Sequence, residues 1–519
     1  MASQLGLFLA DQKTNQLNDM GQIVSFEDAY KEWRNRTRRF NRGSIIRAAM
    51  NRLAQPAANQ LEDLKRAPWL TMLIVKWVCQ DKMMKSHVGE NISTQHFINL
   101  CQMLWRMPDR LDFSSKEIRP FRLVIRQLLN SQIGFQQPHS AGFVREAALL
   151  AKQPKNSALR ISFEGKTGIE INEFIDLSLA IYSPILNGAR RISLSWFDPL
   201  RATYSDQSIG NFLTCISRTP AELVDLCRGL PHANRKVASE LYEFPVLRRY
   251  PFLRKDSEIE CWHPAIFYRG MESLVHSILS EEGEDYILPF SKLFEEHVIA
   301  EARTIPAELL DEDTIRKFVS PEVQVPDGLL AFPDVNIFIE SKAGIFDESV
   351  MMAGHSEIFA HKTKALKKAV HQARSACLSL RREKRAPNRV LNADRNYLLI
   401  VTNRELGAGR GTALAEMYPP GTLDHPNKEG EKQLPLDHIY VLSIADFERL
   451  AAGARRKEFE LSEMLEACVL DDSDPGSARQ YFEQHLNEHR ISNHQSDLVR
   501  CAIDESSERL KLAFTRQEQ

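Results

Sequence analysis

Apolar residues recur at helical spacing through most of the first 245 residues. Helices are predicted over residues 26–53, 69–78, 97–107, 121–129 and 158–185, the last with a short predicted strand at 159–163. Residues 250–268 change character, because apolar runs flank a polar turn at 254–257 that favours a hairpin. We therefore expect a mainly α-helical region over 1–245, which selects a substrate or partner, followed by a hairpin and connector over 246–284.

From residue 285 to residue 455 the pattern becomes helix, strand, strand, helix, strand, helix, strand. The main predicted elements are a helix at 291–302, strands at 328–332 and 335–341, a long helix at 356–385, and strands at 397–402 and 438–443. Strands that alternate with helices indicate an α/β (α+β) domain, a mixed sheet flanked by helices. An acidic stretch at 471–476 is expected to set a charged helical C-terminal tail apart within residues 456–519.

The two predicted strands at 328–332 and 335–341 carry the candidate chemistry. Asp327 stands just before the first strand, and Glu340 and Lys342 stand near the end of the second. Side chains alternate along a strand, so Glu340 and Lys342 point to one face while Ser341 points to the other. Buried charges are costly unless they are paired or bind a metal. Two carboxylates from neighbouring strands suit Mg²⁺ or Mn²⁺, and a nearby lysine can help the attacking water.

This segment resembles the PD-(D/E)xK nuclease superfamily, which has the restriction-endonuclease-like fold. The matching residues are Pro326-Asp327 and, after twelve intervening residues, Glu340-Ser341-Lys342. The resemblance covers roughly residues 285 to 450 and implies metal-dependent cleavage of phosphodiester bonds. It implies that Asp327 and Glu340 hold the divalent ion and that Lys342 assists the water.

Two further site residues follow from the same resemblance. Family members often carry an acidic ligand on the helix before the hairpin, which here implies Glu295, with Glu296 as the neighbouring alternative. Many also carry a glutamine on the helix after the hairpin. Gln372 occupies that place, although Ala376 stands where the family's aromatic residue would be.

The helix after the hairpin has a basic side. Its apolar stripe is formed by Leu366, Ala369, Val370, Ala373, Ala376, Cys377 and Leu380. The opposite side is expected to present Lys364, Lys367, Lys368, His371 and Arg374 to the backbone of a nucleic acid. The alternative interpretation is an ordinary solvated helix face. A second basic run, residues 31–52, could bind nucleic acid or an acidic partner.

Composition narrows the setting. The chain has 519 residues, a net charge of -2 and 43% hydrophobic residues, which excludes wholesale disorder. No apolar run approaches the length of a membrane helix, so no membrane association is expected. The eight cysteines are scattered without a CxxC pair, which argues against a zinc ribbon or a disulfide framework and favours the cytoplasm.

The sequence thus predicts a Mg²⁺- or Mn²⁺-dependent endonuclease, with DNA favoured by the resemblance and a restriction or anti-phage defence setting as an expectation. One alternative is a catalytically inactive nuclease-fold subunit that binds nucleic acid or acts as a scaffold. Another is an RNA or tRNA nuclease. A partner subunit or a second copy of the chain is expected to bind, if at all, through the N-terminal helices or the C-terminal tail.

Overall fold

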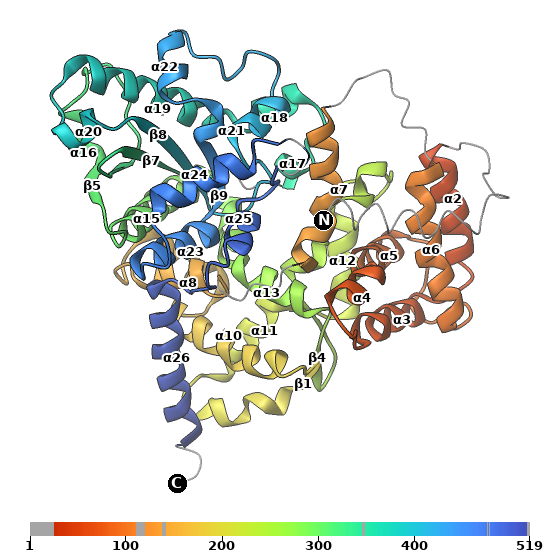
Figure 1. Cartoon of the computed structure of the whole chain (residues 1–519). Helices are drawn as coiled ribbons and strands as arrows, with labels where there is room; N and C mark the ends of the chain where they lie inside the picture. The colour runs from red at the N-terminus through yellow and green to blue at the C-terminus, as the bar shows by residue number, and fades with distance from the viewer. Residues whose placement is uncertain are drawn as a thin grey trace. The chain divides into compact units, whose positions relative to one another are not determined.

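The computed structural model describes residues 25–110, 120–136, 142–344, 348–474, 476 and 478–515. Helices and two mixed β-sheets make up these residues, so the predicted mixed α/β class is confirmed (Figure 1). The described residues divide into two compact units. The first consists of residues from 1–118 and 221–241, and the second of residues from 119–220 and 242–519. The acidic stretch at 471–476 includes Pro475, which lies outside the described residues.

The first unit is helical. Its elements are α2 (Phe26–Thr37), α3 (Arg42–Ala54), α4 (Gln60–Lys65), α5 (Pro68–Gln80), α6 (Thr94–Arg110), α12 (Pro220–Gly229) and a 3-10 turn at Ala238–Leu241. Every residue of α5 is buried, as its nearly continuous apolar sequence predicts. Trp77 of α5 contacts Trp33 edge-on, with ring centroids 5.2 Å apart, while Lys76 pairs with buried Glu240 at 2.9 Å.

The second unit begins with helices packed beside a small sheet. The helices are α7 (Phe121–Gln136), α8 (Arg145–Ala151), α9 (Ala158–Thr167), α10 (Ile171–Leu186), α11 (Asp206–Ile216), α13 (Pro264–Glu272) and α14 (Leu274–Leu279), with a 3-10 helix at Leu194–Ala202. The sheet has the order β1 (Arg191–Ser193), β4 (Glu258–Cys261), β3 (Phe252–Arg254), β2 (Ser217–Arg218). The antiparallel pair β3–β4 confirms the predicted hairpin. The predicted strand at 159–163 is wrong, since these residues lie inside α9, which Ser157 caps and Gly168 ends in the left-handed conformation.

A five-stranded sheet forms the rest of the second unit. Its order is β5 (Glu308–Asp311), β6 (Gly328–Ala331), β7 (Val335–Lys342), β8 (Arg395–Thr402), β9 (Ile439–Ser443). The pairs β5–β6 and β6–β7 are antiparallel, while β7–β8 and β8–β9 are parallel. The sheet's helices are α15 (Glu284–Ala302), α16 (Glu312–Arg316), α17 (Glu348–Met351), α18 (Ser356–Lys362), α19 (Lys364–Glu383), α20 (Asn388–Leu391), α21 (Gly411–Met417), α22 (Lys428–Gln433) and α23 (Ile444–Arg455).

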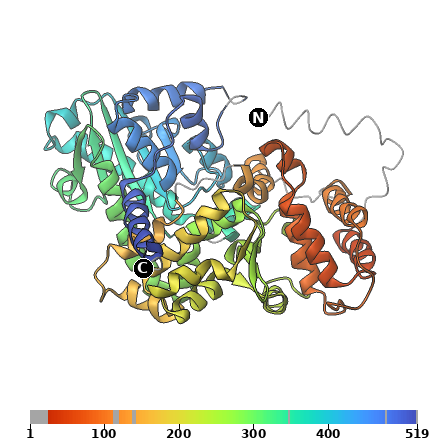
Figure 2. The same ribbon diagram turned by 90° about the horizontal axis from the view of Figure 1, so that it is seen from below.

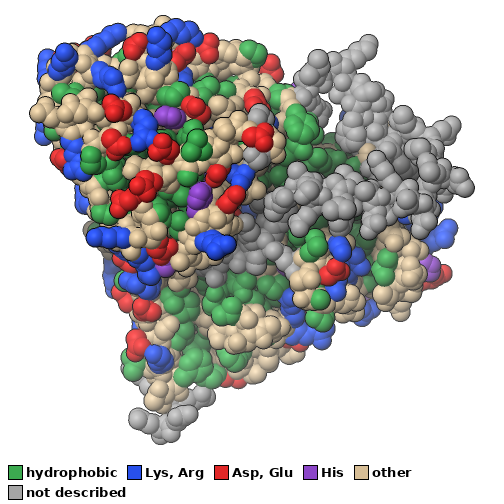
Figure 3. Space-filling view, in the orientation of Figure 1, with side chains coloured by type: hydrophobic (Ala, Val, Ile, Leu, Met, Phe, Trp, Pro, Cys, Tyr) green, Lys and Arg blue, Asp and Glu red, His purple; other side chains and the backbone are tan. Residues whose placement is uncertain are grey.

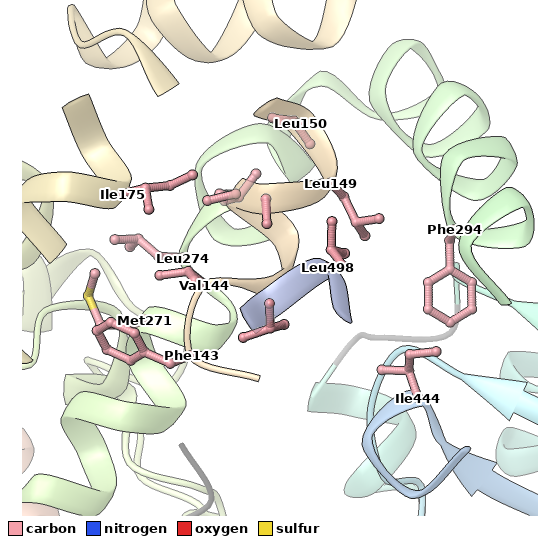
Figure 4. Close-up of a cluster of buried hydrophobic side chains, with 14 of the residues drawn as sticks. Phe143, Val144, Leu149, Leu150, Ile175, Met271, Leu274, Phe294, Ile444 and Leu498 are labelled. Atoms are coloured by element: carbon pink, nitrogen blue, oxygen red, sulfur yellow. The ribbon is translucent and has the colours of Figure 1, made fainter. Parts of the chain in front are cut away.

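Both faces of this sheet are covered by helices. Along β7, Ile337 and Ile339 join the core under α15 and α23, whereas Phe338 joins the core under α19. Val335 joins the same core as Ile337 and Ile339, so the side chains of β7 alternate between the two faces of the sheet. Figure 1 shows α19 on one side of β7 and β8, with α15 and α23 on the other. Figure 4 draws Phe294 of α15 and Ile444 of α23 within the first of these cores.

The long helix predicted at 356–385 is interrupted. Thr363 leaves the helical conformation between α18 and α19, and its hydroxyl bonds the Phe359 carbonyl and the Tyr418 hydroxyl. The interruption lets α19 follow the strands while α18 turns toward α21. The predicted apolar stripe of α19 is confirmed, because all seven of its residues are buried.

The C-terminal helices α24 (Leu461–Asp471), α25 (Phe482–Glu488) and α26 (Asp497–Thr515) are built into the second unit. Leu498, Val499, Leu510 and Ala513 of α26 are buried in the core that also contains α8 and α10. Arg509 of α26 pairs with buried Asp176 of α10 at 2.8 Å, and Figures 1 and 2 show the two helices side by side. The C-terminal segment is thus helical, as predicted, and one face of α26 is apolar and buried.

Each of four regions has a functional role predicted from the sequence, and these roles stay predictions. The regions are residues 1–245, 246–284, 285–455 and 456–519. As compact units the chain divides differently, because residues 143–220 share a core with the five-stranded sheet. Among the described residues, no helix is long and apolar enough to cross a membrane.

Candidate active site

The register of three antiparallel strands gathers carboxylates at one end of the sheet. Asp311 of β5 pairs with Gly328 of β6, and Gly328 pairs with Ile339 of β7. Pairing partners in antiparallel strands step in opposite directions, so Asp327 comes next to Glu312 on one side and Glu340 on the other. Strand pairing alone thus brings the predicted Asp327 and Glu340 to the same end of the sheet.

Helix α15 adds a further carboxylate. Carboxylate oxygens of Glu295, Glu312 and Asp327 all lie within 4.8 Å of one another, and the three side chains are half-buried. At Gly328 strand β6 runs close to α15, since a Cβ there would stand 2.9 Å from the end of the Ile299 side chain. Glu296 is exposed and outside the group, so the helical phase in the folded protein favours Glu295 over its neighbour.

Glu340 and Lys342 lie together on one face of β7, as strand alternation predicts. The Lys342 ammonium donates to Glu340 Oε1 and, at 3.0 Å, to the Ser341 carbonyl. Glu340 is 2% exposed, and its Oε2 atom is buried without a hydrogen-bond partner. A buried carboxylate oxygen without a donor is costly unless something outside the chain satisfies it.

The electrostatics of the site follow from this crowding of carboxylates. Burial raises the pKa of Glu340 to about 7, the nearby charge of Asp327 adds to the shift, and Lys342 opposes it. The pKa of Glu295 is also raised, first by burial and then by Asp327 and Glu312. A cation would relieve both effects. Hard carboxylate oxygens in this number fit Mg²⁺ or Mn²⁺.

Two residues hold the loop that carries Asp327. Asp327 Oδ2 accepts hydrogen bonds from the backbone N–H and the hydroxyl of Ser341, each at 2.6 Å. Gln372 of α19 donates to the Val325 carbonyl, two residues before Asp327. The structure therefore brings Gln372 to the site through a backbone contact. Sequence reasoning missed Glu312 and Ser341. The acidic run 311–313 at the end of a strand was the available signal for Glu312.

The basic side of α19 is partly as predicted. Lys364, Lys367 and Lys368 are exposed. His371 is half-buried, and its Nε2 donates to the Thr422 carbonyl at 3.3 Å. Arg374 is a correction, because it is 2% exposed and its guanidinium donates to the carbonyls of Leu434 and Leu423 at 3.0 and 2.6 Å. It holds neighbouring segments together and does not face solvent. Over the face that Figure 3 presents, basic and acidic side chains are interspersed.

The second basic run lies in the first unit. Its aromatic residues Trp33 and Phe40 are buried, and Arg38 pairs with Asp81 at 2.7 Å. Lys31 and Arg34 line a cleft of about 1130 Å³. Three more basic side chains, Arg228, Arg235 and Lys236, line it together with His232, Tyr30 and the acidic Glu27. Five basic side chains against one acidic side chain give this cleft an excess of positive charge.

The described residues thus contain a cluster of carboxylates at one end of the sheet, with Lys342 on the neighbouring strand β7. Exposed lysines lie on α19. Glu295, Glu312 and Asp327 form the group that could hold a divalent cation. Glu340 is not a member of that group, but it lies close enough for the charge of Asp327 to raise its pKa. No family model, no curated protein and no solved structure matches this chain.

Proposed function

We propose that the protein is a metal-dependent nuclease that hydrolyses phosphodiester bonds, and that residues 285–455 have the restriction-endonuclease-like fold. The observation that carries the proposal is the buried, partnerless Glu340 Oε2 beside Lys342, at the sheet end where Glu295, Glu312 and Asp327 converge. The order α15, hairpin, α19, β8, β9 agrees with the resemblance.

The donor set fits Mg²⁺ or Mn²⁺, with Asp327, Glu340 and Glu295 as ligands and Glu312 as an additional carboxylate. Such an ion supplies charge neutralisation at the phosphate and activation of the attacking water when it is bound. In the chain itself, Ser341 keeps the Asp327 carboxylate oriented by two hydrogen bonds. Gln372 fixes the backbone that precedes it. These contacts preorganise the carboxylates before a substrate arrives.

In this proposal Lys342 assists the water molecule that attacks the phosphate. Its ammonium lies against Glu340 and the Ser341 carbonyl, and the side chain is 19% exposed, so it is accessible from the site. A lysine in this place can orient water and stabilise negative charge on the phosphate. The same pair also supports the competing proposal, an inactive fold in which Lys342 and Glu340 form only a structural ion pair.

DNA is the favoured substrate on the basis of the resemblance, with RNA or tRNA as the alternative. Exposed Lys364, Lys367 and Lys368 on α19 support a polyanionic ligand of either kind. A cytoplasmic setting belongs to the same proposal, since all eight cysteines are free. A role in restriction or phage defence rests on the resemblance alone.

The test is incubation of the full chain with duplex DNA, single-stranded DNA and RNA in Mg²⁺ or Mn²⁺. Lys342→Ala should lower the cleavage rate about 10²- to 10⁴-fold while nucleic-acid binding is retained. Glu295→Gln should also impair cleavage, whereas its exposed neighbour Glu296→Gln serves as the matched control and should cut normally. Mn²⁺ titration of the wild type and Glu340→Gln decides between the proposals. A chain that cuts none of the substrates and binds Mn²⁺ no better than Glu340→Gln would be the inactive scaffold.

A further inference from the structure

A second group of metal-ligating side chains lies at the C-terminal end of the second unit, where α24 meets α25. Asp471 ends α24, His485 lies in α25 and His489 follows one helical turn later. One ligand atom from each of the three lies within 4.8 Å of the other two. His485 and His489 have the i, i+4 spacing that places both rings on the same side of a helix.

His485 is held as a metal-ligating histidine would be. Its side chain is 1% exposed, and its Nε2 donates to the Asp472 carboxylate at 3.0 Å. The other oxygen of Asp472 accepts from the Arg479 backbone N–H at 2.7 Å, which fixes the carboxylate. A carboxylate bound to one ring nitrogen sets the tautomer and leaves the lone pair on the other nitrogen.

The second ring nitrogen of His485, Nδ1, is the atom available to a metal ion. Nδ1 of His485 is buried and has no hydrogen-bond partner among the residues that the structure describes. It points toward Asp471 Oδ2 at 3.8 Å, which is too long for a hydrogen bond. Tyr440 and Phe482 pack their rings against His485, with ring centroids 5.9 and 5.8 Å from it. A buried, fixed and partnerless imidazole nitrogen is rare in folded proteins.

The distances suit a shared ion, which would replace the hydrogen bond that His489 Nε2 makes with Asp471 Oδ2 at 3.0 Å. Bonds of about 2.0–2.1 Å to a tetrahedral Zn²⁺ place the ligand atoms roughly 3.3 Å apart. Asp471 Oδ2 lies 3.8 Å from His485 Nδ1 and 3.0 Å from His489 Nε2, on either side of that value. The side chains of Asp471 and His489 are each 30% exposed, so an ion can enter from solvent and keep a water ligand.

We propose that Asp471, His485 and His489 form a binding site for a divalent transition-metal ion, with Zn²⁺ as the ion expected. Two imidazoles and one carboxylate favour Zn²⁺ over Mg²⁺, which prefers oxygen ligands. The ion joins the end of α24 to α25, which packs against β9, and so fastens the C-terminal helices to the sheet. The site is separate from the carboxylates of Glu295 and Asp327 and does not depend on the nuclease proposal.

The experiment measures Zn²⁺ bound by the full chain after treatment with chelator and dialysis, and uses Co²⁺ absorption to report the ligand set. The wild type should bind Zn²⁺ at a site that Glu340→Gln retains and that His489→Gln loses, with affinity lowered at least 100-fold. Asp472→Asn, which only orients His485, should weaken binding about 10- to 100-fold. Zn²⁺ should raise the melting temperature of the wild type but not of His489→Gln.

His494→Gln is the matched control, because His494 pairs with Glu458 at 2.8 Å in the same region but belongs to no group of three ligands. It should bind Zn²⁺ like the wild type. His489 is partly exposed, so the His489→Gln variant is expected to fold even if substitution of buried His485 disrupts the protein. The proposal is overturned if His489→Gln binds Zn²⁺ as tightly as the wild type, or if all Zn²⁺ binding disappears in Glu340→Gln.

Discussion

Glu340 carries a charge that its surroundings disfavour. Burial, and then the charge of Asp327, raise its pKa from an ordinary 4.5 to about 7. The folded protein therefore retains a proton that the unfolded chain has lost between about pH 4.5 and pH 7. Linkage requires that stability falls as pH rises through this window. The loss in free energy of unfolding caused by the ionised Glu340 is absent below pH 4.5 and fully present above about pH 7.

In EDTA, the free energy of unfolding of Glu340→Gln should increase relative to that of the wild type as the pH is raised from 5 to 8. The relative gain should reach at most about 3 kcal/mol, since one pKa unit corresponds to about 1.4 kcal/mol. Urea unfolding of both proteins at the two pH values measures it, with Glu296→Gln as the exposed control. Adding Mg²⁺ should reduce the pH dependence of the wild type, because a cation favours the ionised carboxylate. An equal stability difference at both pH values would contradict the raised pKa.

At this scale, strand alternation was sufficient to predict that Glu340 and Lys342 share a face, because β7 is regular up to its last residue. Glu312 could not be reached in the same way. It stands close to Asp327 only because β5 pairs with β6. That pairing joins Asp311 to Gly328 across the sixteen residues between them, a separation that no local pattern reveals.

At the scale of the element, α19 shows how far periodicity reaches. The 3.6-residue period identified seven of the eight buried apolar residues and missed Leu378. It placed Arg374 on the solvent side, where the structure buries it against the carbonyls of Leu423 and Leu434. Those carbonyls belong to segments around α22 that cover one flank of α19. The sequence of one helix does not indicate which other segment covers its side. The burial of polar residues at the edge of an apolar stripe is therefore the part that periodicity predicts least well.

This difference gives a prediction about nucleic-acid binding. Replacing Lys364, Lys367 and Lys368 together by Gln should flatten the slope of log affinity against log salt by about two to three units on duplex DNA. Filter binding between 50 and 200 mM salt measures the slope. The control replaces three other exposed lysines, Lys152, Lys155 and Lys511, with the same change of net charge. Equal slopes in the two triple variants would mean that α19 is an ordinary solvated face.

At the scale of the whole molecule, the second unit depends on contacts between segments far apart in the chain. Helices α8 and α10, α15 before the sheet, α23 after it and the C-terminal α26 share one apolar core. The sequence pattern separated these segments at residues 245 and 455, because periodicity and composition report local structure and not which amphipathic faces meet. Four of the five strands of the large sheet were predicted, and only the edge strand β5 was missed.

Substitution of Glu448 in α23 tests whether α8 and α10 fold together with the five-stranded sheet. Glu448 is 1% exposed and accepts from Arg145 of α8 at 2.6 and 2.9 Å, and His297 of α15 lies 2.8 Å from it. Burial alone would raise its pKa, but Arg145 and His297 lower it to about 2. Removing one member of such a buried set leaves an uncompensated charge, so Glu448→Ala should destabilise the protein by about 3–5 kcal/mol.

The control is Glu466→Ala, which also removes the partner of an arginine, Arg395 at 2.7 Å, but whose carboxylate side chain is 52% exposed. Exposed pairs contribute little, so this variant should lose less than about 1 kcal/mol. Urea unfolding measures both values, and hydrogen exchange reports where protection is lost. Because α8 packs in the same core, Glu448→Ala should weaken protection in α8 and α10 as well as in α23. Protection that falls in α23 alone would instead mean that residues 143–220 fold independently of the sheet, as a separate recognition region requires.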